Sequence, residues 1–411
     1  MLHRVRLDGY ATFGELIAWI IGWDLVLEFS LAAAVVAKGW SQYLAEVIGL
    51  TGLGLATTFP VGALTVDWGA AALVAALTTL LVLGTKLSSR VSQVITAIKV
   101  AVVLLVIVVG LGYVSAENYT PFVPPAAEGS KAASGLDQSL LSLLLGGETS
   151  TYGLFGLFAG AAIVFFAFIG FDIIATTAEE TRNPQRDMPR GILGALAIVT
   201  LLYVGVALVL TGMQPYTALA TTDEGAATLA TAFAAVGVDW AAAVISIGAL
   251  AGLTTVVMVL LLGQTRVLLA MSRDGLIPRG LSATGSRGTP VRITVGVGVL
   301  VAIAAATVEF ATLAELVNVG TLFAFVLVSI GIIVLRRTRP ELPRAFRVPL
   351  VPWLPIAAVL ACLWLMLNLT AFTWLRFLGW MVLGLVLYFA YGARKSRLRV
   401  TTPSTGGDRV R

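Results

Sequence analysis

The chain carries, from Leu157 to Thr177, the run LFAGAAIVFFAFIGFDIIATT, in which a single residue is charged. A helix needs about 20 consecutive apolar residues to cross a hydrocarbon layer about 30 Å thick. Within lipid, a helix satisfies the hydrogen-bonding groups of its own backbone, which an isolated strand cannot do. The run is therefore predicted to be a membrane-spanning helix.

Nine further apolar runs of similar length lie on both sides of this one. They are predicted at Gly14–Ala37, Trp68–Leu87, Val91–Val114, Gly191–Gly212, Ala241–Leu269, Val291–Val308, Leu313–Leu335, Trp353–Leu369 and Trp374–Tyr391. The alternation of polar and apolar residues that is typical of a membrane β-barrel is absent from these runs. The sequence therefore predicts an all-α integral membrane protein with about ten transmembrane helices.

The composition excludes several classes of protein. Of the 411 residues, 58% are hydrophobic and 12% are charged, whereas a soluble domain carries about 25% charged residues. This excludes a soluble enzyme, and so apolar a chain is not disordered. The only histidine is His3 and the only cysteine is Cys362, so neither a multi-histidine metal site nor an internal disulfide is expected.

The basic residues indicate how the chain is oriented in the membrane. Of the 27 lysines and arginines, 23 lie at the termini or in loops on one side of the predicted bundle. Such an excess is typical of cytoplasmic loops, so we expect both termini to be cytoplasmic and no nucleic-acid partner. Residues 1–392 are predicted to form a single polytopic domain with an outside loop at about 115–156. Residues 393–411 are predicted to be a basic cytoplasmic tail without order.

Four charged residues fall inside the predicted spans, where each is costly and marks a candidate functional site. Asp24 and Glu28 are four residues apart and therefore share a helix face. Lys99 lies about 12 Å into its span at 1.5 Å per residue, and Asp172 lies in the fourth span. A lysine with little access to water can gain and lose a proton near neutral pH. Structural pairing among these groups is the alternative, and for Asp24 it is an equally good interpretation.

A break in the fourth span is a second candidate feature. The segment Phe168–Asp172 places a glycine and a carboxylate among aromatic residues at mid-membrane. Transporters bind their substrates at such helix breaks, where backbone groups replace water, and glycine permits the break. The alternative is that Gly170 is only a packing contact between helices.

Long stretches of the chain resemble one family. Residues 166–192, FAFIGFDIIATTAEETRNPQRDMPRGI, are similar to the sixth helix and following loop of amino acid permeases of the APC superfamily, and closest to the bacterial members of its cationic amino acid transporter branch. Residues 14–29, 263–278 and 315–349 resemble the third helix, the end of the eighth, and the tenth helix with its following loop. The resemblance extends from Tyr10 to about Gly392.

This resemblance implies a LeuT-like bundle of two inverted repeats that transports amino acids by alternating access, coupled to protons and without a cofactor. The residues that it places in the substrate site and its coupling are Phe166, Ala167 and Ile169 (carbonyls for the substrate ammonium), Gly170, Phe171 (an aromatic gate), Glu28 (an acid near the substrate) and Lys99 (the proton-coupling amine). Asp24 and Asp172 are expected to support or gate the site. No metal is implied.

One departure from the family affects the predicted activity. The first span here corresponds to the third helix of the family, so we expect its first two helices to be missing, and with them the backbone N–H groups that hold the substrate carboxylate. The prediction is an amino acid permease of the cell membrane, with the lipid bilayer and a small amino acid as its partners. The alternative is a non-transporting membrane scaffold or an inactive fragment. A membrane enzyme is not expected, because no nucleophile–base pair is recognisable.

Overall fold

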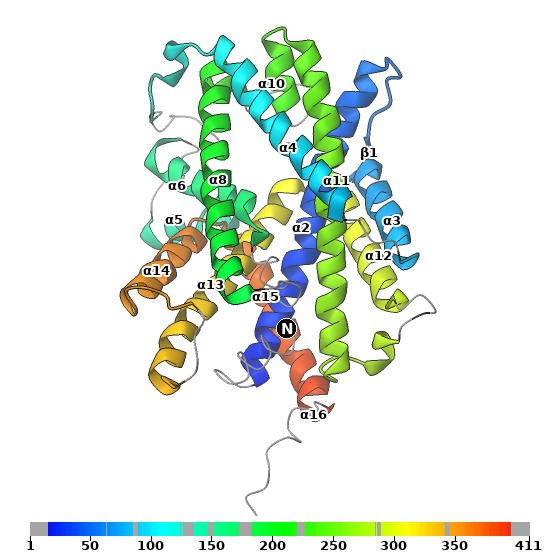
Figure 1. Ribbon diagram of the computed structural model, residues 1–411, viewed down its shortest axis with the longest axis vertical. Coiled ribbons are helices and arrows are strands. Elements are labelled where there is room, and N and C mark those ends of the chain that lie inside the picture. The colour runs from blue at the N-terminus through cyan, green and yellow to red at the C-terminus, as the bar shows by residue number, and fades with distance from the viewer. Residues whose placement is uncertain are drawn as a thin grey trace, which may run out of the picture.

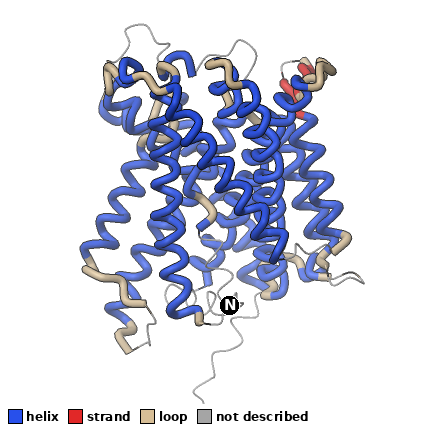
Figure 2. Tube along the Cα trace, turned by 45° about the horizontal axis from the view of Figure 1, so that its top comes forward, coloured by secondary structure: helices blue, strands red, loops and turns tan. Residues whose placement is uncertain are grey.

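The computed structural model is almost entirely helical (Figures 1 and 2). The described residues are 15–62, 64–84, 89–123, 125, 135–146, 152–171, 183–219, 227–283, 285, 289–341 and 346–395. The predicted tail beyond Lys395 and the gating residue Asp172 lie outside them.

Six of the described helices are long and apolar enough to cross a membrane. They are α2 (Glu15–Leu50), α4 (Ser89–Gly110), α8 (Pro184–Met213), α11 (Asp239–Arg273), α13 (Phe310–Thr338) and α15 (Ala371–Leu387), the last continued by a π-helical turn, Tyr388–Gly392. Four shorter apolar helices complete the bundle: α3 (Trp68–Val82), α6 (Gly153–Val164), α12 (Val291–Thr307) and α14 (Trp353–Leu367). Each predicted span therefore coincides with an apolar helix, and the chain is an all-α, multi-pass membrane protein.

Several predicted boundaries are wrong. Helix α2 extends to Leu50 and not to Ala37. Its last turns carry Lys38, Gln42 and Glu46 four residues apart, on one face, so the helix continues as an amphipathic one after its continuous apolar run has ended. The fourth span is shorter than predicted, because its α-helical part ends at Val164 and not at Thr177.

Short elements fill the connections. Strands β1 (Thr58–Val61) and β2 (Leu64–Asp67) pair antiparallel as a hairpin between α2 and α3. The described part of the predicted outside loop contains α5 (Leu140–Leu145) and two 3₁₀ turns, and α6 already begins at Gly153. Three further short helices are α9 (Tyr216–Leu219), α10 (Leu229–Ala235) and α16 (Ala393–Lys395), so the start of the predicted tail is helical.

Helix α2 forms the axis of the core. It packs against α11, α13, α3, α12 and α15, and Figure 1 shows it running through the middle of the bundle. Opposed contacts between Gly22 and Met271, Phe29 and Gly263, and Gly39 and Leu253 show that α2 and α11 lie antiparallel over most of their length. This register places the charged residues of the core relative to one another.

The lower half of α2 is locked to α15 by tryptophans. The Trp23 ring stacks on Trp380 with centroids 4.4 Å apart, and its Nε1 donates to the Trp380 carbonyl at 2.9 Å. One turn earlier, Trp19 Nε1 donates to the carbonyl of Gly384, also at 2.9 Å. We call these four residues the tryptophan zipper.

The upper half of α2 is tied to the start of α3. Asp67 caps α3 by accepting from the Ala70 N–H at 2.9 Å, and the same oxygen accepts from the Ser41 hydroxyl at 2.6 Å. Lys38 Nζ lies 4.0 Å from the other carboxylate oxygen. An N-cap carboxylate at a helix start satisfies backbone N–H groups that have no partner within the helix, so Asp67 joins α2 to α3 with one side chain.

Candidate functional site

The fourth span is interrupted between Phe165 and Gly170, which overlaps the segment Phe168–Asp172 where the break is predicted. Helix α6 ends at Val164, residues Phe165–Phe168 form a 3₁₀ turn, and Ile169 adopts extended backbone angles. Gly170 follows with φ of +116°, a conformation that residues with a Cβ rarely adopt. The N–H of Ile169 turns back to the Phe166 carbonyl at 3.1 Å. The chain therefore leaves the α-helical hydrogen-bond ladder between Phe165 and Gly170.

Two side chains from other helices hold this break. Asn318 of α13 is fully buried, and its Nδ2 donates to the carbonyls of Ala162 at 2.8 Å and Ile163 at 3.2 Å. Tyr203 of α8 donates its hydroxyl to the carbonyl of Ala167 at 2.6 Å, and its ring packs edge-on against Phe168. Carbonyls that are released by a helix break need new donors, and these two residues provide them.

Some of the carbonyls that are predicted to bind the substrate ammonium therefore already accept hydrogen bonds within the protein. Those of Phe166 and Ala167 each accept at least one hydrogen bond within the protein. A carbonyl oxygen has two lone pairs, so one internal bond does not by itself prevent it from accepting from an ammonium group. The side chains of Phe166 and Ile169 pack on the main core cluster around α2.

The predicted gate, Phe171, packs against α13. Its ring lies 5.3 Å from that of Phe325, which also receives Phe165 edge-on at 6.0 Å. An aromatic cluster therefore borders the break. Asp172, the next residue, lies outside the described residues.

Asp24 and Glu28 are both buried on α2, with exposed fractions of 0% and 1%. Asp24 faces α13, because its Oδ1 lies 2.9 Å from the position that a Cβ would occupy at Gly320. Gly320 is two residues from Asn318, so Asp24 lies level with the residue that holds the break but on another face of α13. Among the described residues, neither oxygen of Asp24 has a hydrogen-bond partner. A buried carboxylate without a partner is costly, so Asp24 stays a candidate for the predicted supporting or gating role.

Lys99 lies elsewhere in the bundle. Its aliphatic chain packs on Gly252 of α11, with Cε 3.1 Å from where a Cβ would stand. In the α2–α11 register, Gly252 is level with Gly39. Gly39 is eleven residues beyond Glu28, or roughly 16 Å along the helix at 1.5 Å per residue. The structure therefore places Asp24 against α13, level with the residue that holds the break, and separates Lys99 from both acids.

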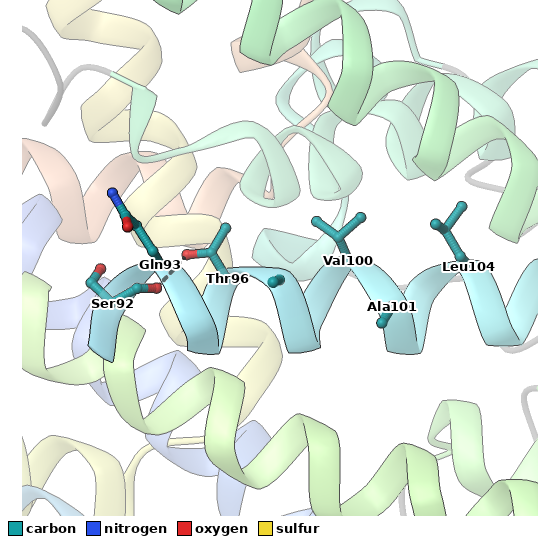
Figure 3. Close-up of a pocket in the computed structure, with 7 residues that line it drawn as sticks. Ser92, Gln93, Thr96, Val100, Ala101 and Leu104 are labelled. Atoms are coloured by element: carbon teal, nitrogen blue, oxygen red, sulfur yellow. Dashed lines mark hydrogen bonds between the residues drawn. The ribbon is translucent and has the colours of Figure 1, made fainter. Parts of the chain in front are cut away.

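An open groove runs along α4 on a different face from these residues. It has a volume of about 570 Å³ and is lined by Ser92, Gln93, Thr96, Ala97, Val100, Ala101 and Leu104 (Figure 3). The polar side chains lie towards the start of α4 and the apolar ones towards its end. None of the residues predicted from the sequence lines this groove.

Sequence reasoning missed Asn318 and Tyr203. Asn318 had a usable signal, because a polar residue in the middle of an apolar span is expected to hydrogen-bond to a neighbouring helix. Tyr203 had none, because a tyrosine in a spanning helix is equally compatible with packing.

Replacing Asn318 by leucine, which is similar in size, should weaken the break. The carbonyls of Ala162 and Ile163 would lose their donor, at a cost of about 1–3 kcal/mol for buried acceptors. We expect at least about fivefold slower solute uptake into proteoliposomes. Asn368→Leu is the matched control, since Asn368 Nδ2 donates to Trp364 within α14, away from the break. Equal losses in both variants would contradict a specific role for Asn318.

The arrangement is suited to binding a small polar solute. The described residues contain no group of three or more His, Cys, Asp or Glu side chains that could hold a metal ion. What they do contain is a broken helix between α8 and α13, and a buried acid on α2. Such a break can bind a small polar solute within the membrane.

Comparisons with known proteins agree with this arrangement. The chain is 43% identical over 399 residues to the branched-chain amino acid permease BcaP of Bacillus subtilis (strain 168), covering 95% of this chain and 79% of that relative. It is 41% identical over 396 residues to the methylthioribose transporter of the same organism, with the same coverage. Cationic amino acid transporter 2, vacuolar, of Arabidopsis thaliana is 38% identical over 343 residues, which are 81% of this chain and 49% of that relative.

The family model described as amino acid permease matches residues 8–388. The match covers the ten apolar helices, the break and each residue predicted for the site. The chain therefore belongs to the amino acid permease family, a family of transporters and not of enzymes.

Proposed function

We propose that this protein carries an amino acid across the cell membrane by alternating access, with both termini in the cytoplasm. The observation that carries the proposal is the break at Phe165–Gly170, which is buttressed by donors from α8 and α13. The substrate ammonium would contact the carbonyls of Phe166, Ala167 and Ile169. Phe171 would cover the bound substrate, Glu28 would be an acid near it, and Asp24 would support the site.

The substrate that we propose is a neutral amino acid with an apolar side chain. The rings of Phe165, Phe171 and Phe325 border the break, and apolar surfaces favour aliphatic groups over a second charge. A relative that is 43% identical is named a branched-chain amino acid permease. A methylthioribose-like solute is the second candidate, because a relative named for that solute is 41% identical.

Uptake into proteoliposomes tests both candidates. Purified protein would be reconstituted with an inward proton gradient, and uptake of labelled leucine and of labelled methylthioribose would be measured. Leucine uptake would be repeated with excess unlabelled valine, arginine or methylthioribose as competitor. We expect competition by valine and little by arginine. Competition by methylthioribose alone would reassign the substrate. A folded protein without uptake of either solute would favour the scaffold alternative.

We propose that protons drive this transport and that Lys99 is the titrating amine. Because Lys99 is separated from the break, coupling would pass through α11, which packs on Lys99 at Gly252 and on α2 along its length. A change in the charge of Lys99 would then alter how α4 packs on α11. That movement would change the access to the break in α6.

Replacing Lys99 by methionine should remove gradient-driven uptake while exchange of leucine across the membrane persists. Methionine keeps the packing on Gly252 but cannot bind a proton. We expect at least about a tenfold loss of gradient-driven uptake, the range of a removed general acid or base. Arg90→Gln, at the exposed start of the same helix, should leave gradient-driven uptake within about twofold. If the proton gradient drives leucine uptake by Lys99→Met as strongly as by the unchanged protein, Lys99 does not couple protons to transport.

A further inference from the structure

A second pocket lies at the end of the bundle where α11 finishes and the chain leaves α15. It has a volume of about 440 Å³ and is lined by Pro278, Arg279, Gly280 and Tyr391. One wall is the turn that follows α11, and the other is the π-helical turn after α15. In Figure 1 these segments lie together at the lower end of the molecule, beside α16. The pocket is remote from the break in α6.

Hydrogen bonds from Ser272 and Arg292 hold the turn that follows α11 in place. The hydroxyl of Ser272, which is fully buried, donates to the carbonyl of Pro278 at 2.9 Å. Arg292, at the start of α12, donates through its guanidinium to the carbonyl of Gly280 at 3.0 Å. This bond places the Arg292 guanidinium beside Gly280, the neighbour of Arg279 in the chain. The pocket is therefore built from ordered backbone, with two guanidinium groups at its edge.

The charge around the pocket is strongly positive. The exposed arginines of these segments are Arg273, Arg279, Arg292 and Arg394. Arg394 follows Tyr391 by three residues, so the two lie on the same face of the helical turn. Among the described residues of 273–292 and 388–395, the only acid is Asp274, which is 9% exposed. Guanidinium groups next to a hydroxyl are the donors that suit a phosphate group, because their planar forks bind its oxygens in pairs.

The neighbouring surface is apolar. On α15, the side chains of Leu383 and Leu387 are 48% and 40% exposed. They precede Tyr391 by eight and four residues, so they lie on its face of the helix and form one stripe leading from the pocket along α15. An apolar stripe at a membrane-spanning helix is where an acyl chain lies, whereas a free phosphate ion would gain nothing from it.

We propose that this pocket binds the phosphate headgroup of an anionic membrane lipid, whose acyl chains lie on the exposed stripe of α15. The headgroup contacts Arg279, Arg292 and the Tyr391 hydroxyl, and Arg394 contributes further positive charge. Basic pockets between membrane helices at the cytoplasmic edge are suited to such headgroups. A bound lipid would join the turn after α11 to the end of α15, two segments more than 100 residues apart in the chain.

Binding of short-chain lipids to the purified protein tests this proposal. The probes are dihexanoyl phosphatidylglycerol, dihexanoyl phosphatidylcholine and inorganic phosphate, and the readout is the dissociation constant in zwitterionic detergent at low salt. The Arg279→Gln/Arg292→Gln double variant should bind the anionic lipid at least about tenfold more weakly than the unchanged protein, the loss expected for a charge-assisted hydrogen bond. Arg337→Gln/Arg339→Gln removes the same charge at the end of α13 and should change binding by less than about twofold.

Three results would overturn the proposal. These are equal losses in the two double variants, equal affinity for the zwitterionic and anionic lipids, and binding of inorganic phosphate as tight as that of the lipid. Thermal unfolding of each variant in detergent shows whether it is folded. If the double variant does not fold, the single variant Arg279→Gln, in an exposed turn, is measured in its place, with Arg337→Gln as its control.

Discussion

Replacing Gly170 by alanine should reduce substrate uptake by about tenfold or more. Gly170 has φ of +116° at the break in α6, and holding a residue with a Cβ in such a conformation costs about 1–3 kcal/mol. An added Cβ would meet no atom of the described residues within 4 Å, so among these residues the penalty is one of backbone conformation and not of crowding. The alanine variant would relieve it by rebuilding a more regular helix, which removes the carbonyls from the proposed site.

Gly160→Ala is the matched control for this prediction. Gly160 lies in the same helix, and an added Cβ there also meets no atom within 4 Å in the part of the chain that the structure describes. It is inside α6, where alanine is favoured over glycine by about 1 kcal/mol. We expect leucine uptake within about twofold of the unchanged protein. If both variants lose uptake equally, or if Gly170→Ala transports normally, the break does not depend on the conformation of Gly170.

Replacing Gly384 by alanine should destabilise the fold by about 1–3 kcal/mol, the usual cost of an overpacked core. An added Cβ would overlap the indole ring of Trp23. That ring cannot move aside easily, because it stacks on Trp380 at 4.4 Å and donates to its carbonyl. Separation of the helices would also break the bond from Trp19 to the carbonyl of Gly384. The measurement is reversible unfolding in detergent micelles, followed by tryptophan fluorescence.

The control is Gly379→Ala, also in α15, where an added Cβ meets no atom within 4 Å. It should be neutral or slightly stabilising. Trp23→Phe should partly rescue Gly384→Ala, because a smaller ring makes room for the methyl group, and the coupling free energy of the pair measures their contact. Equal stability of the two glycine variants would mean that the tryptophan zipper is not closely packed at Gly384.

The boundary of α2 illustrates how far local patterns predict the fold. The continuous apolar run ends at Ala37, and the prediction ended there. The helix continues to Leu50 because Lys38, Gln42 and Glu46 recur at a spacing that keeps them on one face. Hydropathy reports which residues tolerate lipid, whereas the helix ends where its backbone hydrogen bonds end, and these two boundaries need not coincide.

The candidate site was predictable only in part. The break at Phe165–Gly170 had a local signal, because a glycine and a carboxylate interrupt an aromatic run. The roles assigned to Glu28, Lys99 and Phe171 remain predictions. The separation of Lys99 from Glu28 had no local signal, because it depends on which residues of α11 lie opposite each of them.

The sequence by itself determined that this protein is a helical membrane protein of the amino acid permease family. Each span must satisfy the hydrogen-bonding groups of its own backbone in lipid, so its length and polarity can be predicted from consecutive residues of the sequence. Only the tertiary structure decided that Asn318 and Tyr203 hold the break, that Asp24 faces Gly320, and that Lys99 lies apart from them. These contacts join residues far apart in the chain, and they depend on the register and rotation with which whole helices pack, which no single helix specifies.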